Sequence, residues 1–221
     1  MASKYKVNDR AFSQYNKEAA YWAGFLAADG CVDSLNRVRL YLGLKDVGHL
    51  YKIKEFLGAD HKVGENHQRN RCSFELTNVS LVKDLYNLYN IKPNKSRDLE
   101  YPMQMPRSLD SHFIRGYWDG DGTLCESFSN VNSKTATFYA AVVGSELFIL
   151  QLAILIEEVF GHQLPCVRFH PNNVNATWKL NTNDAFSFCE YIYKESTIHT
   201  RLNRKYEIYK RVVLDNNRLK R

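Results

Sequence analysis

The sequence contains one short pattern twice, and this repeat limits the possible folds more than any other feature. The stretches YWAGFLAADGCV and FIRGYWDGDGTL each place a glycine before an aromatic residue and then reach an Asp-Gly pair. Gly24 aligns with Gly116 and Asp29 with Asp121, so that both pairs are 92 residues apart. Such a repeat predicts two structurally similar halves within one chain.

The similarity continues beyond the two motifs, although with insertions. After each Asp-Gly pair come strand-like residues, an amphipathic helix that ends in glycine, two short strands and another helix. The order helix-β-β-helix-β-β-helix therefore occurs twice. We expect an α+β protein made of two pseudo-symmetric αββαββα half-domains.

A proline-containing segment separates the two halves. The stretch KPNKSRDLEYPMQMPR carries three prolines, which cannot continue a helix or occupy a central strand. We therefore expect a first half-domain at residues 1–95, a linker at 96–106 and a second half-domain at 107–221. The second half is expected to end in a basic helix that begins at about Arg201.

Glycines inside the two motif helices indicate how the halves meet. A glycine within a helix costs about 0.5 to 1 kcal/mol relative to alanine, so that a compensating contact is expected. Either the two helix backbones approach each other closely, or each glycine faces a bulky side chain of its own half. Because the small residues and the Asp-Gly pair occur in both helices, the sequence favours mutual packing about a pseudo-twofold axis. The small residues are Ala23, Gly24, Ala27 and Ala28 in the first helix and Gly116 and Gly120 in the second.

Mutual packing would place Asp29 and Asp121 near each other at two helix C-termini. Both carboxylates would then repel each other and the negative ends of the helix dipoles unless a cation intervenes. A single Asp-Gly at a helix end is more often a plain turn. Its repetition in register favours a divalent cation such as Mg²⁺, which takes one or two carboxylates and completes its octahedron with other oxygens.

Composition argues against several other classes of protein. The five cysteines are scattered, and neither they nor the seven histidines have the spacing of a zinc site or a redox motif. We expect the cysteines to be small core residues in a reducing compartment. The apolar runs are too short and too charged to span a bilayer, and no signal pattern occurs near Met1, so an intracellular protein of a bacterial cytoplasm or an organelle is expected. The formal net charge of +6 favours a polyanionic partner only mildly.

The stretches WAGFLAADG and IRGYWDGDG resemble the two signature motifs of the LAGLIDADG homing endonucleases in their single-chain, two-motif form. The resemblance covers nearly the whole chain, because the repeated element order is that of the family's half-domain. It implies a monomer that makes a double-strand break with short 3′ overhangs in a long DNA site. The implied metal is Mg²⁺, with Mn²⁺ or Ca²⁺ able to replace it for binding.

The resemblance also implies roles for individual residues of the motifs. The last aspartate of each family motif coordinates the metal ions, which places metal binding and catalysis on Asp29 and Asp121. The carbonyls of Ala28 and Gly120 are implied to lie close to the metals. An earlier acidic position of the motif is Asp119 in the second copy but Ala27 in the first, so we expect Asp119 to be structural.

The predicted strands alternate between buried and outward side chains, which suits a DNA-reading sheet. Alternation in RVRLYLGL directs Val38, Leu40, Leu42 and Leu44 inward. Outward Arg, Asn and Glu can bond the edges of G, A and C in a major groove, although a solvated polar face is the more usual reason for such alternation. Residues expected to contact DNA from the sheets are Arg37, Arg39, Tyr41, Arg71, Ser73, Glu75, Tyr139, Arg168, Thr177, Lys179 and Asn181. Residues expected to contact phosphates are Lys45, Lys95, Lys134 and Lys205.

The supporting catalytic side chain and the reaction itself are less constrained. Thr77 and Asn181 hold the strand-end position where the family often places a lysine or glutamine, so Lys45 and Lys179 are the remaining candidates. A non-cleaving binder on the same scaffold is the main alternative, either a maturase that binds intron RNA or a DNA-binding regulator. A plain interaction domain is a further alternative, but it would leave the repeated Asp-Gly unexplained.

Overall fold

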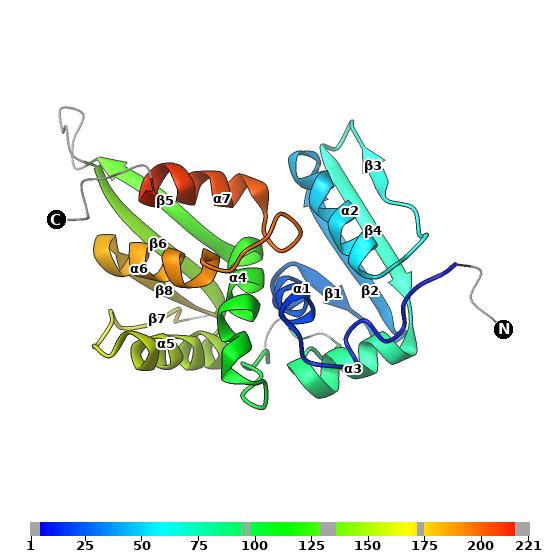
Figure 1. The fold of residues 1–221 in the computed structure, drawn as a ribbon, viewed down its shortest axis with the longest axis horizontal. Coiled ribbons are helices and arrows are strands. Elements are labelled where there is room, and N and C mark those ends of the chain that lie inside the picture. Colours follow the sequence, from blue (N-terminus) through cyan, green and yellow to red (C-terminus); the bar gives the residue numbers. More distant parts are fainter. Residues whose placement is uncertain (1–4, 94, 96–97, 129–135, 172–174, 215–221) are drawn as a thin grey trace. The chain divides into compact units, whose positions relative to one another are not determined.

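The computed structural model describes residues 5–93, 95, 98–128, 136–171 and 175–214. The chain forms two compact units, shown in Figure 1. The first unit comprises Met1–Lys95 and Pro102–Gly120, and the second comprises Ser96–Tyr101 and Asp121–Arg221. The second motif is thus divided between the units, because its helix packs in the first unit while its final aspartate belongs to the second.

The first unit contains one antiparallel sheet with helices on one face (Figure 1). The strand order is β1-β2-β4-β3. Its elements are α1 (Lys17–Ala28), β1 (Gly30–Val32), β2 (Arg37–Gly43), η1 (Leu44–Asp46), α2 (Val47–Phe56), β3 (Gly64–Asn66), β4 (Arg71–Thr77), α3 (Val79–Tyr89), η2 (Arg107–Leu109) and α4 (Asp110–Asp121).

The second unit repeats this sheet with the order β5-β6-β8-β7. Its elements are β5 (Gly122–Phe128), β6 (Ala136–Ser145), α5 (Glu146–Phe160), β7 (Arg168–Phe169), β8 (Asn175–Asn181), α6 (Thr182–Tyr193), α7 (Asn203–Tyr209) and η3 (Lys210–Leu214). With α4 counted at its start, the second half has the same helix-β-β-helix-β-β-helix order as the first. The predicted α+β class and the pseudo-symmetric halves are therefore confirmed.

Capping residues explain where several helices begin and end. Asn16 accepts hydrogen bonds from the backbone N–H groups of Glu18 and Ala19, which satisfies two donors at the start of α1. Asn78 begins α3 in the same way, through the N–H of Leu81. Gly161 ends α5 with a φ of 70°, a left-handed conformation that glycine adopts without steric cost.

Strand alternation fixes the buried face of each sheet. In β4 the side chains of Cys72, Phe74 and Leu76 are buried, while their neighbours in the strand are exposed or half-buried. The inward direction predicted for β2 holds for Val38 and Leu40, which are buried. Leu42 and Leu44 are only half-buried, because the strand ends at Gly43 and Leu44 begins the short helix η1.

The cysteine prediction is only partly right. Cys72 and Cys189 are buried, as expected, but Cys31 and Cys166 are exposed, and none of the five cysteines forms a disulfide bond. Cys31 occupies the outward position of the three-residue strand β1, where the alternation allows no burial. None of the described helices combines the length and the apolar character that crossing a membrane requires.

Candidate active site and nucleic-acid interface

The two motif helices α1 and α4 pack closely at a glycine in each helix, Gly24 and Gly116. A Cβ atom added at Gly24 would overlap the carbonyl oxygen of Phe113, and one added at Gly116 would overlap the carbonyl oxygen of Tyr21. Both obstacles are backbone atoms of the opposite helix, which cannot rotate away as a side chain could. The mutual packing predicted from the repeat is therefore confirmed, and the alternative of glycines facing bulky side chains is excluded.

This contact continues to the C-terminal ends of both helices. A Cβ atom at Gly120 would overlap the Cβ atom of Ala28 and would lie 3.4 Å from Cγ of Asp29. Asp29 is the C-cap residue of α1, and its N–H donates to the carbonyl of Phe25 at 3.0 Å. Its side chain is exposed, as is that of Asp121, the last residue of α4. Each motif therefore ends in a carboxylate that solvent or a ligand can reach.

Lys95 is buried at the end of α1. Its Nζ donates to the carbonyl oxygen of Ala27 at 2.7 Å and to that of Ala28 at 3.4 Å, and the residue is 5% exposed. The ammonium group thus satisfies carbonyls that the helix end leaves without partners. Its positive charge also offsets the negative end of the helix dipole, next to Asp29.

Lys205 has a comparable place in the second unit. It belongs to α7, and its Nζ donates to the carbonyl oxygen of Gly122, the residue after Asp121. Each motif aspartate therefore has a neighbouring carbonyl that accepts from a lysine distant in sequence. The sequence predicts phosphate contacts for both lysines and leaves Lys45 and Lys179 as the candidates for the supporting catalytic role. Lys95 and Lys205 each lie in the basic segment that closes one repeat, and this shared position is the sequence feature that could have identified them.

Asp119 belongs to a buried hydrogen-bond network and not to the exposed helix end. Its Oδ2 accepts the hydroxyl proton of Tyr21 at 2.9 Å, which links α4 to α1, and the residue is 1% exposed. His49 of α2 lies 3.0 Å from the same hydroxyl oxygen through its Nε2. Because Tyr21 has one hydroxyl proton and donates it to Asp119, the Nε2–H of His49 must donate to Tyr21. This burial agrees with a structural role for Asp119.

Charges in this network shift the pKa values of its members. Burial raises the pKa of Tyr21 well above its usual value, and the Asp119 carboxylate raises it further, whereas the Arg115 guanidinium lowers it. Tyr21 is therefore a neutral hydrogen-bond donor at all physiological pH values. Burial, with a smaller contribution from the charge of Lys52, lowers the pKa of His49 to about 3. His49 is thus neutral in the folded protein.

We predict that acid destabilises the protein through His49. Its pKa is about 3 when folded and about 6.5 when unfolded, so the unfolded chain binds the extra proton first as the pH falls. The stability that His49 contributes is complete above pH 6.5 and decreases by up to about 1.4 kcal/mol per pH unit below it. Urea unfolding at pH 7 and pH 5, compared with a His49→Phe variant, measures this effect. We expect the wild type to lose about 2 kcal/mol more than the variant, and an equal loss in both proteins would contradict the prediction.

The exposed faces of the two sheets carry different side chains at equivalent positions. In the first unit Arg37 pairs with Thr77, Arg39 with Glu75 and Tyr41 with Ser73 across β2 and β4. In the second unit the corresponding pairs across β6 and β8 are Tyr139 with Asn181, Ala141 with Lys179 and Val143 with Thr177. These positions correspond because Gly30 and Gly122 are the equivalent glycines that follow the two motif aspartates. Gly30 lies opposite Leu40 of β2, and Gly122 lies opposite Val142 of β6. The two faces therefore share one backbone pattern but differ in chemistry.

Several predicted DNA contacts have partners within the protein. Nζ of Lys179 lies 3.8 Å from the centroid of the Tyr139 ring, and Thr177 bonds His170 at 2.8 Å. Arg168 pairs with Thr177 across β7 and β8 and is exposed. Lys45 is exposed in η1, whereas Lys134 lies outside the described residues.

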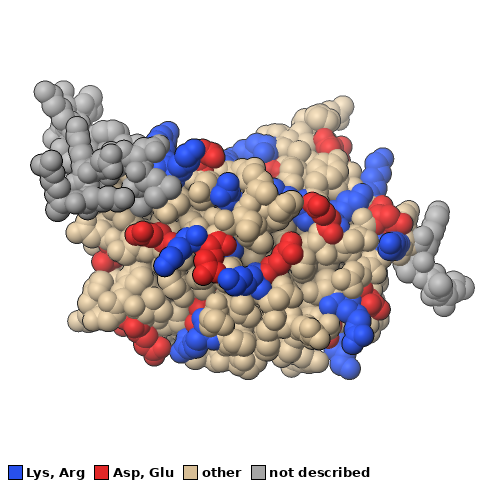
Figure 2. All heavy atoms as spheres, in the orientation of Figure 1, with Lys and Arg blue, Asp and Glu red and all other residues tan. Residues whose placement is uncertain are grey.

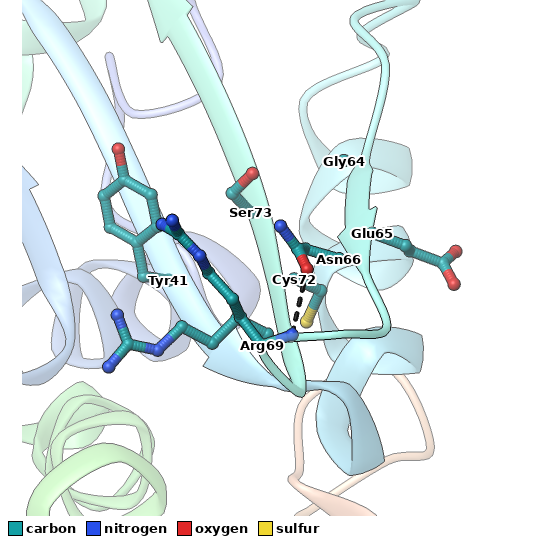
Figure 3. Close-up of a pocket in the computed structure, with 8 residues that line it drawn as sticks. Tyr41, Gly64, Glu65, Asn66, Arg69, Cys72 and Ser73 are labelled. Carbon is teal, nitrogen blue, oxygen red and sulfur yellow. Dashed lines mark hydrogen bonds between the residues drawn. The ribbon is translucent and has the colours of Figure 1, made fainter.

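An open pocket of about 300 Å³ lies on the outer face of the first sheet, between β2, β3 and β4. Figure 3 shows its lining, with Glu65 directed away from Tyr41. The carboxylate of Glu65 accepts the hydroxyl proton of Tyr51 in α2 at 3.1 Å, so it lies toward the helices. The pocket residues are Tyr41, Gly64, Glu65, Asn66, Arg69, Arg71, Cys72 and Ser73. The pocket therefore presents an aromatic ring and two arginines to a ligand on the sheet.

Surface charge alone does not locate a binding face. Figure 2 shows Lys and Arg side chains interspersed with Asp and Glu over the face in view. A modest net charge of +6 agrees with this mixture. The sheet registers gather arginine, lysine, asparagine and threonine on the outward faces of the central strands β2, β4, β6 and β8, and they locate a candidate interface better than charge does.

The residues at the motif ends fit a magnesium ion better than a structural metal. In the part of the chain that the structure describes, no group of three or more His, Cys, Asp or Glu side chains could hold a metal ion. A zinc site needs such a closed set of protein ligands. Mg²⁺ instead keeps several waters and binds through one or two carboxylates together with substrate phosphates. Single exposed carboxylates at the two motif ends match this second kind of site.

Comparison with solved structures identifies the fold. The meganuclease I-SmaMI bound to uncleaveable DNA superposes with a TM-score of 0.60 at 11% identity, covering 90% of this chain and 92% of that one. The LAGLIDADG homing endonuclease I-LtrWI bound to target DNA superposes with a TM-score of 0.59 at 14% identity, covering 93% of this chain and 92% of that one. I-GzeII, a LAGLIDADG homing endonuclease in complex with its DNA target, superposes with a TM-score of 0.57 at 12% identity, covering 89% of this chain and 88% of that one.

The chain therefore has the fold of the LAGLIDADG homing endonucleases in their single-chain, two-domain form. The resemblance drawn from the two motifs is confirmed at this level. No protein-family model and no curated protein matches the sequence. Similarity between the solved structures and this chain thus lies in backbone arrangement and hardly in sequence.

Proposed function

We propose that this protein is a site-specific DNA endonuclease that makes a double-strand break in a long, asymmetric duplex site. The observation that carries the proposal is the pair of exposed carboxylates, Asp29 and Asp121, each at the end of a motif helix and each beside a lysine-bonded carbonyl. A protein that only binds DNA gains nothing from carboxylates next to phosphates, because like charges repel. The reaction proposed is metal-dependent phosphodiester hydrolysis that leaves short 3′ overhangs.

Asp29 and Asp121 would hold the divalent metal, with Mg²⁺ the expected ion. When bound, the ion supplies Lewis-acid polarisation of the phosphate and a more acidic water. The carbonyl of Gly120 remains a predicted neighbour of the metal. The carbonyl oxygen of Ala28 accepts a hydrogen bond from Lys95 at 3.4 Å, and its second lone pair would remain for coordination of the metal ion.

Buried Lys95 and half-buried Lys205 would balance charge around the aspartates. Each motif helix ends with its negative dipole end next to a carboxylate, and the scissile phosphates add further negative charge. Lys95 and Lys205 place a cation at each of these ends, held by backbone carbonyls. We propose that these lysines, and not Lys45 or Lys179, support the reaction.

The sheets would bind the duplex and determine its sequence. Arginine, asparagine, lysine and glutamate at the outward positions suit base edges in the major groove, which admits a β-ribbon. Because the two faces differ at every pair compared above, the DNA site should be asymmetric. One chain carries both halves, so the proposed enzyme acts as a monomer, and its biological role would be homing of an intron, an intein or a free-standing gene.

The proposal is tested with the purified protein and a randomised duplex library in Mg²⁺. We expect cleavage of a small set of related sequences, with both strands cut a few bases apart. Sequencing of the cut ends gives the site and the overhang together. Tight, selective binding without cleavage in Mg²⁺ or Mn²⁺ would instead indicate a DNA-binding regulator, and selective protection of a structured intron RNA would indicate a maturase.

A further inference from the structure

The carboxylate of Asp33 uses its two oxygens for two separate purposes. It lies in the turn between β1 and β2, where Oδ1 accepts the backbone N–H of Leu35 at 2.9 Å and that of Arg37 at 3.1 Å. Oδ2 accepts Nε of Arg37 at 2.8 Å and Nη2 of Arg39 at 3.2 Å. One oxygen therefore holds the turn, and the other holds two arginine side chains together.

Both arginines remain available to a ligand. The side chain of Arg37 is 38% exposed and that of Arg39 is 25% exposed, whereas that of Asp33 is only 15% exposed. A guanidinium carries five N–H donors in a rigid fork, and a bidentate contact to guanine needs two of them. Because Asp33 already restricts both side chains, they lose less conformational freedom on binding than free arginines would.

Asp33 is ionised under all conditions relevant to this contact. Partial burial opposes its ionisation, but hydrogen bonds from Arg37 and from the N–H of Leu35, together with the Arg37 charge, outweigh it and lower the pKa of the carboxyl. The interaction is thus a charge-assisted one, which is shorter and more directional than a neutral hydrogen bond.

The spacing of the two arginines matches the spacing of stacked bases. Arg37 and Arg39 are two residues apart in β2 and point to the same face, which separates them by about 6.7 Å along the strand. Two base steps along one DNA strand span about 6.8 Å. A β2 strand that follows the major groove would therefore present its two arginines to base pairs two steps apart.

We propose that Asp33 is a positioning residue that sets Arg37 and Arg39 as a pair to read G·C base pairs two steps apart in one half of the DNA site. The proposal rests on the proposed function, because it assigns part of the sequence specificity to that enzyme. Arg37 and Arg39 contact the bases, and Asp33 acts only through them.

The second unit provides an internal comparison. By the same register, the positions of Asp33, Arg37 and Arg39 are held there by Cys125, Tyr139 and Ala141. No arginine pair stands at these positions, so the repeated fold does not require the arrangement. A change at Asp33 should alter discrimination in one half of the DNA site only.

Asp33→Asn separates the two uses of the carboxylate. The asparagine side chain retains an oxygen for the N–H groups of Leu35 and Arg37, so the turn is kept. Its NH₂ group replaces the oxygen that accepts from both arginines. Because an NH₂ group is a donor, it cannot accept the hydrogen bonds of the two guanidinium groups. The variant therefore releases the arginines without removing the turn. Asp60→Asn, which removes one exposed carboxylate elsewhere in the first unit, is the matched control for net charge.

The test is a selection of bound sequences from a randomised duplex library in Ca²⁺, followed by sequencing, for the wild type and four variants. We expect the wild type to prefer G·C at two positions two steps apart. Asp33→Asn should weaken both preferences about five- to tenfold, within the range of a bidentate arginine contact. Arg37→Lys should weaken one preference and Arg39→Lys the other. Asp60→Asn should change neither, and the preferences in the other half-site and the melting temperature should stay the same.

The outcomes separate this inference from the proposed function. Selective binding by the wild type with unchanged preferences in Asp33→Asn would overturn the inference alone. A uniform change across all positions would also overturn it, because loss of a negative charge near phosphates affects affinity without sequence information. Absence of any selective duplex binding by the wild type would overturn the proposed function and this inference together.

Discussion

Replacing Asp29 with Asn is expected to reduce double-strand cleavage at least about 100-fold while duplex binding persists. Loss of a metal ligand should reduce activity more than loss of a residue that only orients such a ligand. Asn has the same shape but no charge, so it cannot attract the divalent ion. Asp29 is exposed, so folding should change by no more than about 0.5 kcal/mol. Asp121→Asn should behave in the same way, because Asp121 ends the other motif helix. Cleavage of a plasmid carrying the selected site measures the effect, since supercoiled, nicked and linear forms separate on a gel.

Two further variants show whether the loss is specific to the exposed aspartates. Asp119→Asn removes a carboxylate from the same motif, but one that is buried and accepts from Tyr21, so cleavage should persist while the melting temperature falls. Lys95→Met keeps both motif aspartates and removes the buried ammonium, and we expect a smaller loss of cleavage than with Asp29→Asn. Full activity in Asp29→Asn, or equal losses in Asp29→Asn and Asp119→Asn at matched folding, would contradict the assignment.

Replacing Gly116 with Ala is expected to destabilise the first unit by about 3 kcal/mol or more, at the upper end of the range for overpacked sites. The new Cβ atom would overlap the carbonyl oxygen of Tyr21 and lie 2.7 Å from the backbone nitrogen of Phe25. Neither atom can move unless α1 and α4 separate. The melting temperature should fall by about 6 to 12 °C, or the protein should fail to fold. Thermal unfolding followed by circular dichroism measures this effect.

Gly48→Ala is the matched control, because it makes the same substitution in a helix without a close contact. Nothing lies within 4 Å of a Cβ atom added at Gly48, which is exposed in α2. Alanine favours a helix over glycine, so this variant should be more stable by about 0.5 kcal/mol. If Gly116→Ala melted at the same temperature as Gly48→Ala, the close backbone contact would be wrong.

The repeat allowed much of this protein to be predicted. Hydrophobic alternation and helical periodicity are local properties, so the element order of both halves and the buried faces of the main strands could be predicted from neighbouring residues. The close packing of the two motif helices at Gly24 and Gly116 could also be predicted, because a glycine within a helix has a cost and both copies of the motif carry one. The exposed position of Asp29 at the end of its helix follows from the same pattern.

Side-chain hydrogen-bond partners that are distant in sequence could not be predicted. Lys95 bonds a carbonyl 68 residues away, Lys205 one 83 residues away, and Tyr21 bonds Asp119 across 98 residues. Asp33 is only four residues from Arg37, yet the sharing of one of its oxygens with Arg39 depends on the turn conformation. The burial of Lys95 likewise depends on the path of the chain after α3.

The sequence by itself determined the two halves, their order of helices and strands, and the glycine contact of the motif helices. Periodicity is a property of neighbouring residues, and repetition is found by comparing segments of the sequence. Neither requires knowledge of the path of the chain in space. The tertiary structure alone decided which lysine meets each motif end, and which acid is buried against Tyr21. A side chain's partner, unlike its burial face, depends on where distant segments meet, because hydrogen bonds and ion pairs act only over a few ångströms.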